Sequence, residues 1–342
     1  MPHISVASFN LLNLALPGVQ FYENQDPYTQ EDFQAKLDWI ARQLDALHCD
    51  VVMFQEVFNL QALQQAVSHS AWMRGATVAA PHADTLVDGR LLPRLGIASR
   101  LPVRELNSFV ELEAADQVPL PGGGVHARFS RPLLEAVVDA HGQLLRVMTV
   151  HLKSKRPEWL DGDDEDNPEL LARAQLRSLM MRGGDALGVR QKVIDRLWRT
   201  REPLVVLGDF NDVIHAQTTQ LIAATTYKRR DAPQRDAMLF DAFDLQRARS
   251  IPFVGAQRRD TAYTHAHEGV PETIDHILVS EEFAPFAKNA RGFVDRVDYF
   301  NDHLALRKRG EREARIYSDH AQVSAILFLD DASENRNGAD PR

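Results

Sequence analysis

Residues 204–212 read Leu-Val-Val-Leu-Gly-Asp-Phe-Asn-Asp, an apolar run followed directly by three polar residues around Phe210. Four apolar residues in a row, two of them β-branched, predict a short buried strand that Gly208 closes. Asp209, Asn211 and Asp212 follow where that strand must reach solvent, and strand ends are rigid places to mount catalytic groups. Taken alone, the same residues are equally typical of a plain turn, because Asp and Asn cap turns well.

Four other predicted strands carry polar groups at one end in the same way. These groups are Asn10 in 4–10, Glu56 in 50–57, His151 in 143–151, and Asp319 with His320 before 321–329. A lone group of this kind is ordinarily solvated or structural. The repetition favours a shared site at the rim of the sheet, where rigid strands hold the groups in place.

Two further features point to the same site. Asp275 lies inside the predicted strand 273–279 among apolar neighbours, so its carboxylate needs a partner to offset the cost of burial. Lys153, Lys155 and Arg156 follow directly after the strand that ends at residue 151. This cluster of cations favours a rim that faces an anion, with Lys153 as a candidate phosphate-binding residue.

Composition describes a globular protein with a negative net charge. The 342 residues are 44% hydrophobic and 25% charged, and the formal net charge is -9. We expect one domain over residues 1–330, followed by a disordered polar tail over 331–342. The charge speaks weakly against tight, sequence-independent binding to long nucleic acid. The negative charge does not exclude an anionic substrate, because a bound metal ion reverses the local electric field.

The ends and the cysteine content predict where the protein works. No run of about 18 apolar residues exists, so we expect no transmembrane segment. The N-terminus lacks the basic and apolar regions of a signal peptide, and Cys49 is the single cysteine. Together these features favour a cytoplasmic protein without disulfides, and we expect it to be a monomer.

The set of polar groups has the chemistry of a hard-cation site. Oxygen and imidazole groups without a thiolate cluster favour Mg²⁺, with Mn²⁺ or Ca²⁺ as alternatives, over structural zinc. Two histidines and a further aspartate beside the metal would supply acid–base and electrophilic partners for attack on a phosphate ester. The acidic run over residues 161–166 is not an EF-hand, because its glycine stands at the second position and not the sixth.

Seven short motifs follow one another in a fixed order between residues 4 and 329. They are Ser8-Phe9-Asn10, Gln55-Glu56, Gly96-Ile97-Ala98-Ser99, Thr149-Val150-His151-Leu152, Gly208-Asp209-Phe210-Asn211, Ile274-Asp275-His276-Ile277 and Ser318-Asp319-His320. This ordered set resembles the endonuclease/exonuclease/phosphatase superfamily, the deoxyribonuclease-I-like proteins. The resemblance implies an α/β fold, a four-layer α/β/β/α sandwich of two packed mixed β-sheets flanked by helices. It also implies a divalent-metal-dependent hydrolase of phosphoesters, usually phosphodiesters.

The resemblance also implies a role for each residue at the metal and the nucleophile. Glu56 would be the main metal carboxylate, and Asn10 and Asp319 would complete the metal site through oxygen or water. Asp209 would hold or deprotonate the attacking water, and Asn211 would steady the phosphate.

The remaining roles concern the phosphate and the leaving group. His320, paired with Asp275, would contact the phosphate, and His151 would contact a phosphate oxygen or assist the leaving group. Arg131 stands where some nucleases of the family place a phosphate-contacting arginine. The chain departs from the family pattern before Ser99, because a glutamate that pairs with the second histidine is replaced by residues 91–94, Leu-Leu-Pro-Arg. A partner for His151 is therefore not predicted.

The leading hypothesis is a Mg²⁺-dependent phosphodiesterase, with DNA or RNA as the first substrate class. The alternatives are a phosphatase or phospholipase C-like enzyme acting on a small or lipid phosphate, and a binding module that has lost the chemistry. The chain contains two Asp-His pairs near its end, Asp302-His303 and Asp319-His320. We expect only the second pair to complete the site, because it opens an apolar, β-branched core strand.

Overall fold

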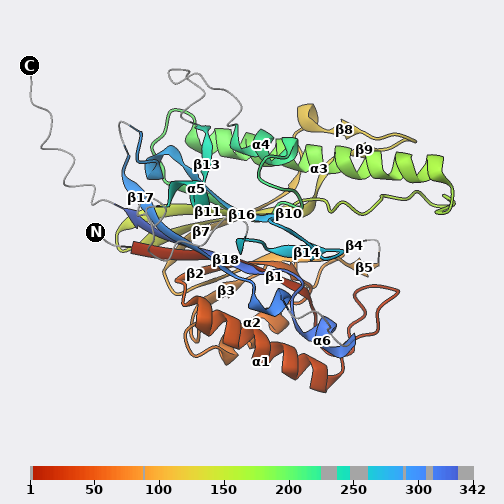
Figure 1. Cartoon of the computed structure of the whole chain (residues 1–342), viewed down its shortest axis with the longest axis horizontal. Helices are drawn as coiled ribbons and strands as arrows, with labels where there is room; N and C mark the ends of the chain where they lie inside the picture. Colours follow the sequence, from red (N-terminus) through yellow and green to blue (C-terminus); the bar gives the residue numbers. More distant parts are fainter. Residues whose placement is uncertain are drawn as a thin grey trace, which may run out of the picture.

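The computed structural model describes residues 3–87, 89–224, 237–246, 261–287, 290–305 and 311–329. Two six-stranded sheets lie face to face, and helices cover the outer face of each sheet (Figure 1). The predicted four-layer α/β/β/α sandwich is therefore confirmed. The predicted tail over residues 331–342 lies outside the described residues.

The first sheet is built from both ends of the chain. Its order is β17 (Gly292–Phe300), β18 (Gln322–Leu329), β1 (His3–Leu14), β2 (Val51–Val57), β6 (Arg94–Ser99) and β3 (Thr77–Ala79). β1 and β2 run parallel, whereas β18 runs antiparallel to β1. Helices α1 (Gln30–Leu47) and α2 (Leu60–His69) cover its outer face, with the short α6 (Glu311–Ile316) beside α1 (Figure 1).

The second sheet contains residues 204–209 as its strand β12. Its order is β13 (Leu239–Asp241), β16 (Asp275–Ser280), β12 (Leu204–Asp209), β11 (Gln143–His151), β10 (Arg128–Ala140) and β7 (Val103–Glu111). β11 and β12 are parallel, and β16 is antiparallel to β12. The outer helices are α3 (Pro168–Leu197) and α4 (Gln217–Ala223), and α5 (Ala242–Leu245) contacts β13, β16 and β17. The short pairs β4 (Leu86–Val87) with β5 (Arg90–Leu91), β8 (Val118–Pro119) with β9 (Val125–His126), and β14 (His265–His267) with β15 (Val270–Glu272) complete the described strands.

The alternation of side chains along β12 creates two cores. Val205 and Leu207 belong to the apolar cluster between the sheets, whereas Leu204 and Val206 belong to the cluster beneath α3. Every residue of the strand is buried, as its uninterrupted apolar sequence predicts for a central strand covered on both faces. A side chain at Gly208 would place its Cβ 2.1 Å from the carbonyl oxygen of Val150, so only glycine permits β12 to lie this close to β11.

Helix α3 differs from the prediction. The sequence predicts two amphipathic helices over 170–181 and 189–198, but the structure has one continuous helix of 30 residues. Asn167 caps its start by accepting the N–H of Glu169 at 2.9 Å, and the paired glycines at 183 and 184 do not break it. A Cβ at Gly184 would lie 2.8 Å from the ring of His126, so this glycine allows close packing and does not end the helix. Among the described residues, no helix combines the length and the apolar character needed to cross a bilayer.

Candidate active site

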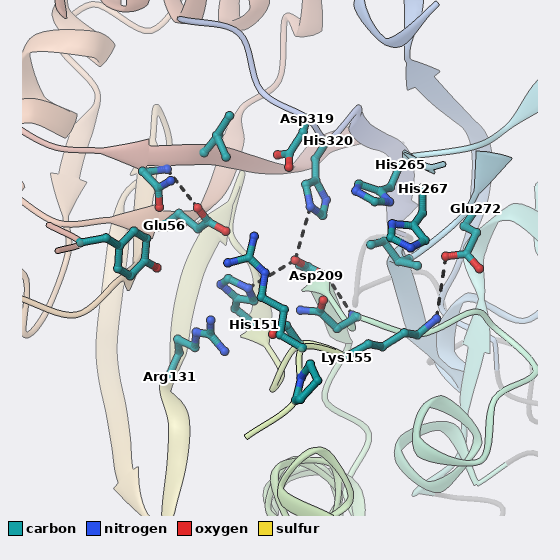
Figure 2. A pocket seen from close by; sticks show the side chains of 18 of the residues that line it. Glu56, Arg131, His151, Lys155, Asp209, His265, His267, Glu272, Asp319 and His320 are labelled. Carbon is teal, nitrogen blue, oxygen red and sulfur yellow. Dashed lines mark hydrogen bonds and ion pairs between the residues drawn. The ribbon is translucent and has the colours of Figure 1, made fainter. Parts of the chain in front are cut away.

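A cavity of about 730 Å³ lies at the rim where strands of both sheets begin or end (Figure 2). The registers explain this convergence: Asn10 pairs with Gln55 across β1 and β2, and His151 pairs with Asp209 across β11 and β12. Because β16 is antiparallel to β12, its first residue, Asp275, lies opposite Asp209.

Most of the predicted site residues line this cavity. They are Glu56, Arg131, His151, Asp209, Asn211, Asp319 and His320. Asn10 and Asp275 lie directly behind them and are bonded to Asp209 and His320, respectively. Lys153 does not line the cavity, because its Nζ contacts a carboxylate oxygen of Glu158 at 3.2 Å. Its neighbours Lys155 and Arg156 provide cations at the cavity instead.

Asp209 is held by contacts to both of its carboxylate oxygens. Its Oδ2 lies 3.2 Å from Asn10 Nδ2, 3.3 Å from His151 Nε2 and 3.8 Å from His320 Nε2. Its Oδ1 accepts the backbone N–H of Asn211 at 2.8 Å. Burial raises the pKa of Asp209 to about 7, which makes this carboxylate suited to accept a proton at neutral pH.

His320 and Asp275 form a buried pair. Nδ1 of His320 lies 2.8 Å from Oδ2 of Asp275, and the backbone N–H of Asp275 donates to Thr264 Oγ1 at 3.0 Å. Burial opposes the charged imidazolium, but Asp275 and Asp209 outweigh it and raise the pKa of His320 well above its usual value. His320 is therefore a cation that directs Nε2 towards the cavity side of Asp209.

His151 lies on the opposite side of Asp209 and has a different character. Burial lowers the pKa of His151 well below its usual value, and the nearby charges of Arg131 and His320 act in the same direction. Its Nε2 points to Asp209, while its Nδ1 is buried without a hydrogen-bond partner among the described residues. The sequence has Leu-Leu-Pro-Arg at residues 91–94 in place of the glutamate that would pair with this histidine, and Nδ1 accordingly has no partner there. The neutral ring is placed to orient Asp209.

Glu56 lies at an irregular point of the first sheet. The pairing of β1 with β2 shifts register between residues 10 and 14, and Glu56 has a φ of 63°, in the left-handed region. Its Oε2 accepts the backbone N–H of Asn13 at 3.0 Å. Other residues of the site share this uncommon backbone conformation, namely Leu12, Asn13 and Asn211. Backbone strain of this kind is retained where the surrounding structure enforces it, often at functional sites.

The carboxylates suit a divalent cation. Burial raises the pKa of Glu56, and the negative charge of Asp319 raises it further. Two carboxylates that repel each other at a cavity wall gain from a shared cation with oxygen preference, such as Mg²⁺. The residues present therefore fit the metal that the sequence predicts.

Asn10 bridges the carboxylates of Glu56 and Asp209. Its Nδ2 donates to Glu56 Oε1 at 3.3 Å as well as to Asp209, and its Oδ1 accepts the N–H of Leu12 at 3.0 Å. The hydroxyl of Ser318 donates to the carbonyl oxygen of Asn10 at 2.7 Å and ties the start of β18 to β1. Direct coordination by Asn10 would use the second lone pair of Oδ1, since the first is engaged.

The second Asp-His pair of the sequence lies outside the cavity. Residues 302–304 form a single 3₁₀ turn, and neither Asp302 nor His303 lines the cavity. His303 Nε2 lies 2.9 Å from the carbonyl oxygen of His320, so it supports the backbone of the pair that does line it.

Asp185 is a buried residue that the sequence analysis missed. It lies in the middle of α3, and its Oδ1 accepts the N–H of Ser130 at 2.9 Å and contacts His126 Nε2 at 2.9 Å. Its Oδ2 accepts the N–H of Lys153 at 2.9 Å. One carboxylate thus fixes the backbone beside Arg131 and the start of the loop after β11. The only sequence signal is a carboxylate on the apolar face of a helix.

The sequence also predicts no role for the residues that form the outer wall of the cavity. Tyr22 and Gln25 come from the loop between β1 and α1, and His265, His267 and Glu272 come from the β14–β15 hairpin. Lys155 lies 3.8 Å from the carboxylate of Glu272, so the loop after β11 and the hairpin meet across the cavity (Figure 2).

Comparisons with known proteins agree with this fold. The family model described as Endonuclease/Exonuclease/phosphatase family matches residues 7–320. An endonuclease/exonuclease/phosphatase family protein from Bacteroides thetaiotaomicron has a TM-score of 0.58 at 17% identity, with 96% of this chain and 99% of that chain covered. A mannosyl-6-phosphatase from Bacteroides thetaiotaomicron gives 0.57 at 17% identity, with coverage of 95% and 100%. The human Nocturnin catalytic domain gives 0.54 at 14% identity, with coverage of 96% and 95%. A search of curated protein sequences gives no match.

Proposed function

The chain belongs to the endonuclease/exonuclease/phosphatase family, and from this premise we propose that it is a divalent-metal-dependent phosphoester hydrolase, with nucleic-acid phosphodiesters as the first substrate class. One observation carries the proposal: the Asp209 carboxylate, the His320–Asp275 pair and the Glu56–Asp319 carboxylates converge on one cavity. This constellation contains a proton acceptor, a cation for the phosphate and a seat for a metal.

Asp209 acts on the attacking water. Asn10 donates to Oδ2, the backbone N–H of Asn211 donates to Oδ1, and Nε2 of His151 lies 3.3 Å from Oδ2, so the carboxylate is fixed in orientation before substrate binds. Its raised pKa lets it take the proton of the water near neutral pH.

The phosphate is received by cations on both sides of Asp209. His320, kept charged by Asp275, donates from Nε2 to a non-bridging oxygen, and Arg131, Lys155 and Arg156 supply further positive charge at the cavity. Such donors matter most where the charge develops in the transition state.

Glu56 and Asp319 would hold the metal, with Asn10 fixing the orientation of Glu56. A divalent cation bound there supplies Lewis-acid stabilisation of charge on the phosphoryl and leaving oxygens. Lys153 belongs to the loop that carries Lys155 and Arg156, and its ammonium group supports that loop through Glu158.

A small phosphate ester is the second candidate substrate. The cavity of about 730 Å³ has the size of a pocket for a small molecule, and the net charge of -9 does not favour a long polyanion. A phosphomonoester would be bound by the same cations, so substrate preference is decided by the outer wall.

A substrate panel with matched variants tests the proposal. Single-stranded DNA, RNA, plasmid, a nitrophenyl phosphodiester, a nitrophenyl phosphomonoester and sugar phosphates are each incubated with Mg²⁺, with Mn²⁺ or with a chelator. We expect hydrolysis that the chelator and Asp209→Asn both abolish, while Asp302→Asn retains it. Activity that persists in the chelator, or in Asp209→Asn, would contradict the assignment.

A further inference from the structure

The β14–β15 hairpin brings an additional imidazole to the site. His265 lies beside His320, with ring centroids 5.2 Å apart, and Asp319 completes a group of three (Figure 2). One ligand atom from each residue falls within 4.8 Å of the others. His265 has no part in the hydrolysis proposed above.

This group differs in chemistry from the oxygen-rich seat at Glu56. Two imidazoles and one carboxylate are typical ligands of Zn²⁺ and similar transition metals, which bind nitrogen more readily than Mg²⁺ does. We propose that His265, Asp319 and His320 form a second cation site, which shares Asp319 with the Glu56 site and binds a borderline transition-metal ion, with Zn²⁺ as the probe. Three protein ligands leave a fourth position open towards the cavity.

The surrounding bonds orient the ligands in advance. Asp275 engages Nδ1 of His320, so a metal would bind Nε2 and displace to solvent the proton that the charged ring carries there, in the carboxylate–histidine arrangement common behind metal-bound imidazoles. The N–H of Ala321 donates to the carbonyl oxygen of Thr264 at 2.7 Å and joins the residues next to His320 and His265. Nδ1 of His265 is shielded from solvent and lacks a hydrogen-bond partner among the described residues.

Occupation of this site has a consequence for catalysis. A metal on Nε2 of His320 removes the group that receives the phosphate in the proposed function, so the ion inhibits hydrolysis. This consequence rests on the proposed function, whereas binding of the ion does not. Asp319 has two carboxylate oxygens and can serve both cations, so Mg²⁺ at Glu56 does not exclude the second ion.

Zn²⁺ binding to the full chain, measured by calorimetry with Mg²⁺ in excess, tests the site. We expect a single Zn²⁺ per chain, with affinity at least about tenfold weaker in His265→Gln and within about twofold of the wild type in His267→Gln. His267 is the matched control, since it is exposed on the same hairpin. Equal affinity in His265→Gln and the wild type would overturn the site, as would loss of Zn²⁺ binding in Glu56→Gln.

A second variant guards against a folding defect in the first. His265→Cys replaces the imidazole by a thiolate, and Co²⁺ bound to it should give a sulfur-to-metal charge-transfer band that the wild type and His267→Cys lack. Absence of the band in folded His265→Cys would also overturn the proposal. The Zn²⁺ concentration that halves Mg²⁺-supported hydrolysis should rise in His265→Gln by the factor found in calorimetry. If the chain hydrolyses no substrate, calorimetry and the Co²⁺ band still decide the metal site.

Discussion

Replacing Asp275 by asparagine should move the pH profile of hydrolysis to lower pH. The carboxylate lies 2.8 Å from Nδ1 of His320 and raises the pKa of that histidine. A hydrogen bond to a charged group contributes about 1.5–3 kcal/mol, which corresponds to about 1–2 pKa units. The alkaline limb of the kcat/KM profile should therefore move to lower pH by about 1–2 pH units.

The acidic limb should move in the same direction. Asp275 also raises the pKa of Asp209, although burial is the larger cause, so removal of its charge lowers that pKa.

The effect on the free energy of unfolding has a definite sign. The folded-state pKa of His320 is raised, so its pair with Asp275 stabilises the fold fully below about pH 6.5 and loses this contribution as pH rises through the folded pKa. The free energy of unfolding of Asp275→Asn should therefore lie further below that of the wild type at pH 6 than at pH 9.

The measurement is kcat/KM between pH 5 and 10, with Asp302→Asn as the control. Asp302 belongs to an Asp-His pair that does not line the cavity, so its variant should keep the wild-type profile. An alkaline limb that stays in place, or that moves to higher pH, in Asp275→Asn would refute the assignment of His320 as the charged donor.

Three further changes separate the roles of individual residues. His320→Ala should lower kcat by about 10²–10⁴-fold, and His151→Ala by less; the reverse order, at equal folded fraction, would exchange their roles. Asp185→Asn should raise KM more than it lowers kcat, because it loosens the backbone beside the cations that are proposed to bind the phosphate; an effect on kcat alone would contradict this. Burial lowers the pKa of Lys36 to about 7, so the unfolded chain binds more protons above that pH, and stability should rise by up to about 5 kcal/mol towards pH 10. Denaturant titrations should show that Lys36→Met removes this rise, and an unchanged slope would contradict it.

The strand-end pattern predicted which residues come together at the cavity, because the pattern depends on local sequence. An apolar run that ends in a polar group shows both the strand and the direction of its end, so Asp209, His151 and Glu56 could be placed before the registers were known. Register itself is a long-range property. The sequence could not show that a carboxylate in α3, Asp185, reaches β10 and the loop after β11 at once.

Departures from the sequence prediction have physical reasons of the same kind. The glycines at 183 and 184 lie between the two predicted helices, but Gly184 allows the close approach of His126 and α3 continues through both. The position of Lys153 after His151 predicts a phosphate-binding residue, but Glu158 engages its ammonium group, and Lys155 and Arg156 line the cavity instead. The β14–β15 hairpin has too few residues for a strand signal, so His265 was not found.

The Mg²⁺ dependence of phosphodiester hydrolysis in Glu56→Gln tests whether Glu56 binds a catalytic divalent cation. The substitution keeps the volume of the side chain and its bond to the N–H of Asn13, but removes the charge that faces the cation. Activity at saturating Mg²⁺ should fall by at least about a hundredfold, and half-saturation should move to higher Mg²⁺ concentration. A wild-type rate with an unchanged Mg²⁺ requirement would exclude Glu56 as a metal ligand.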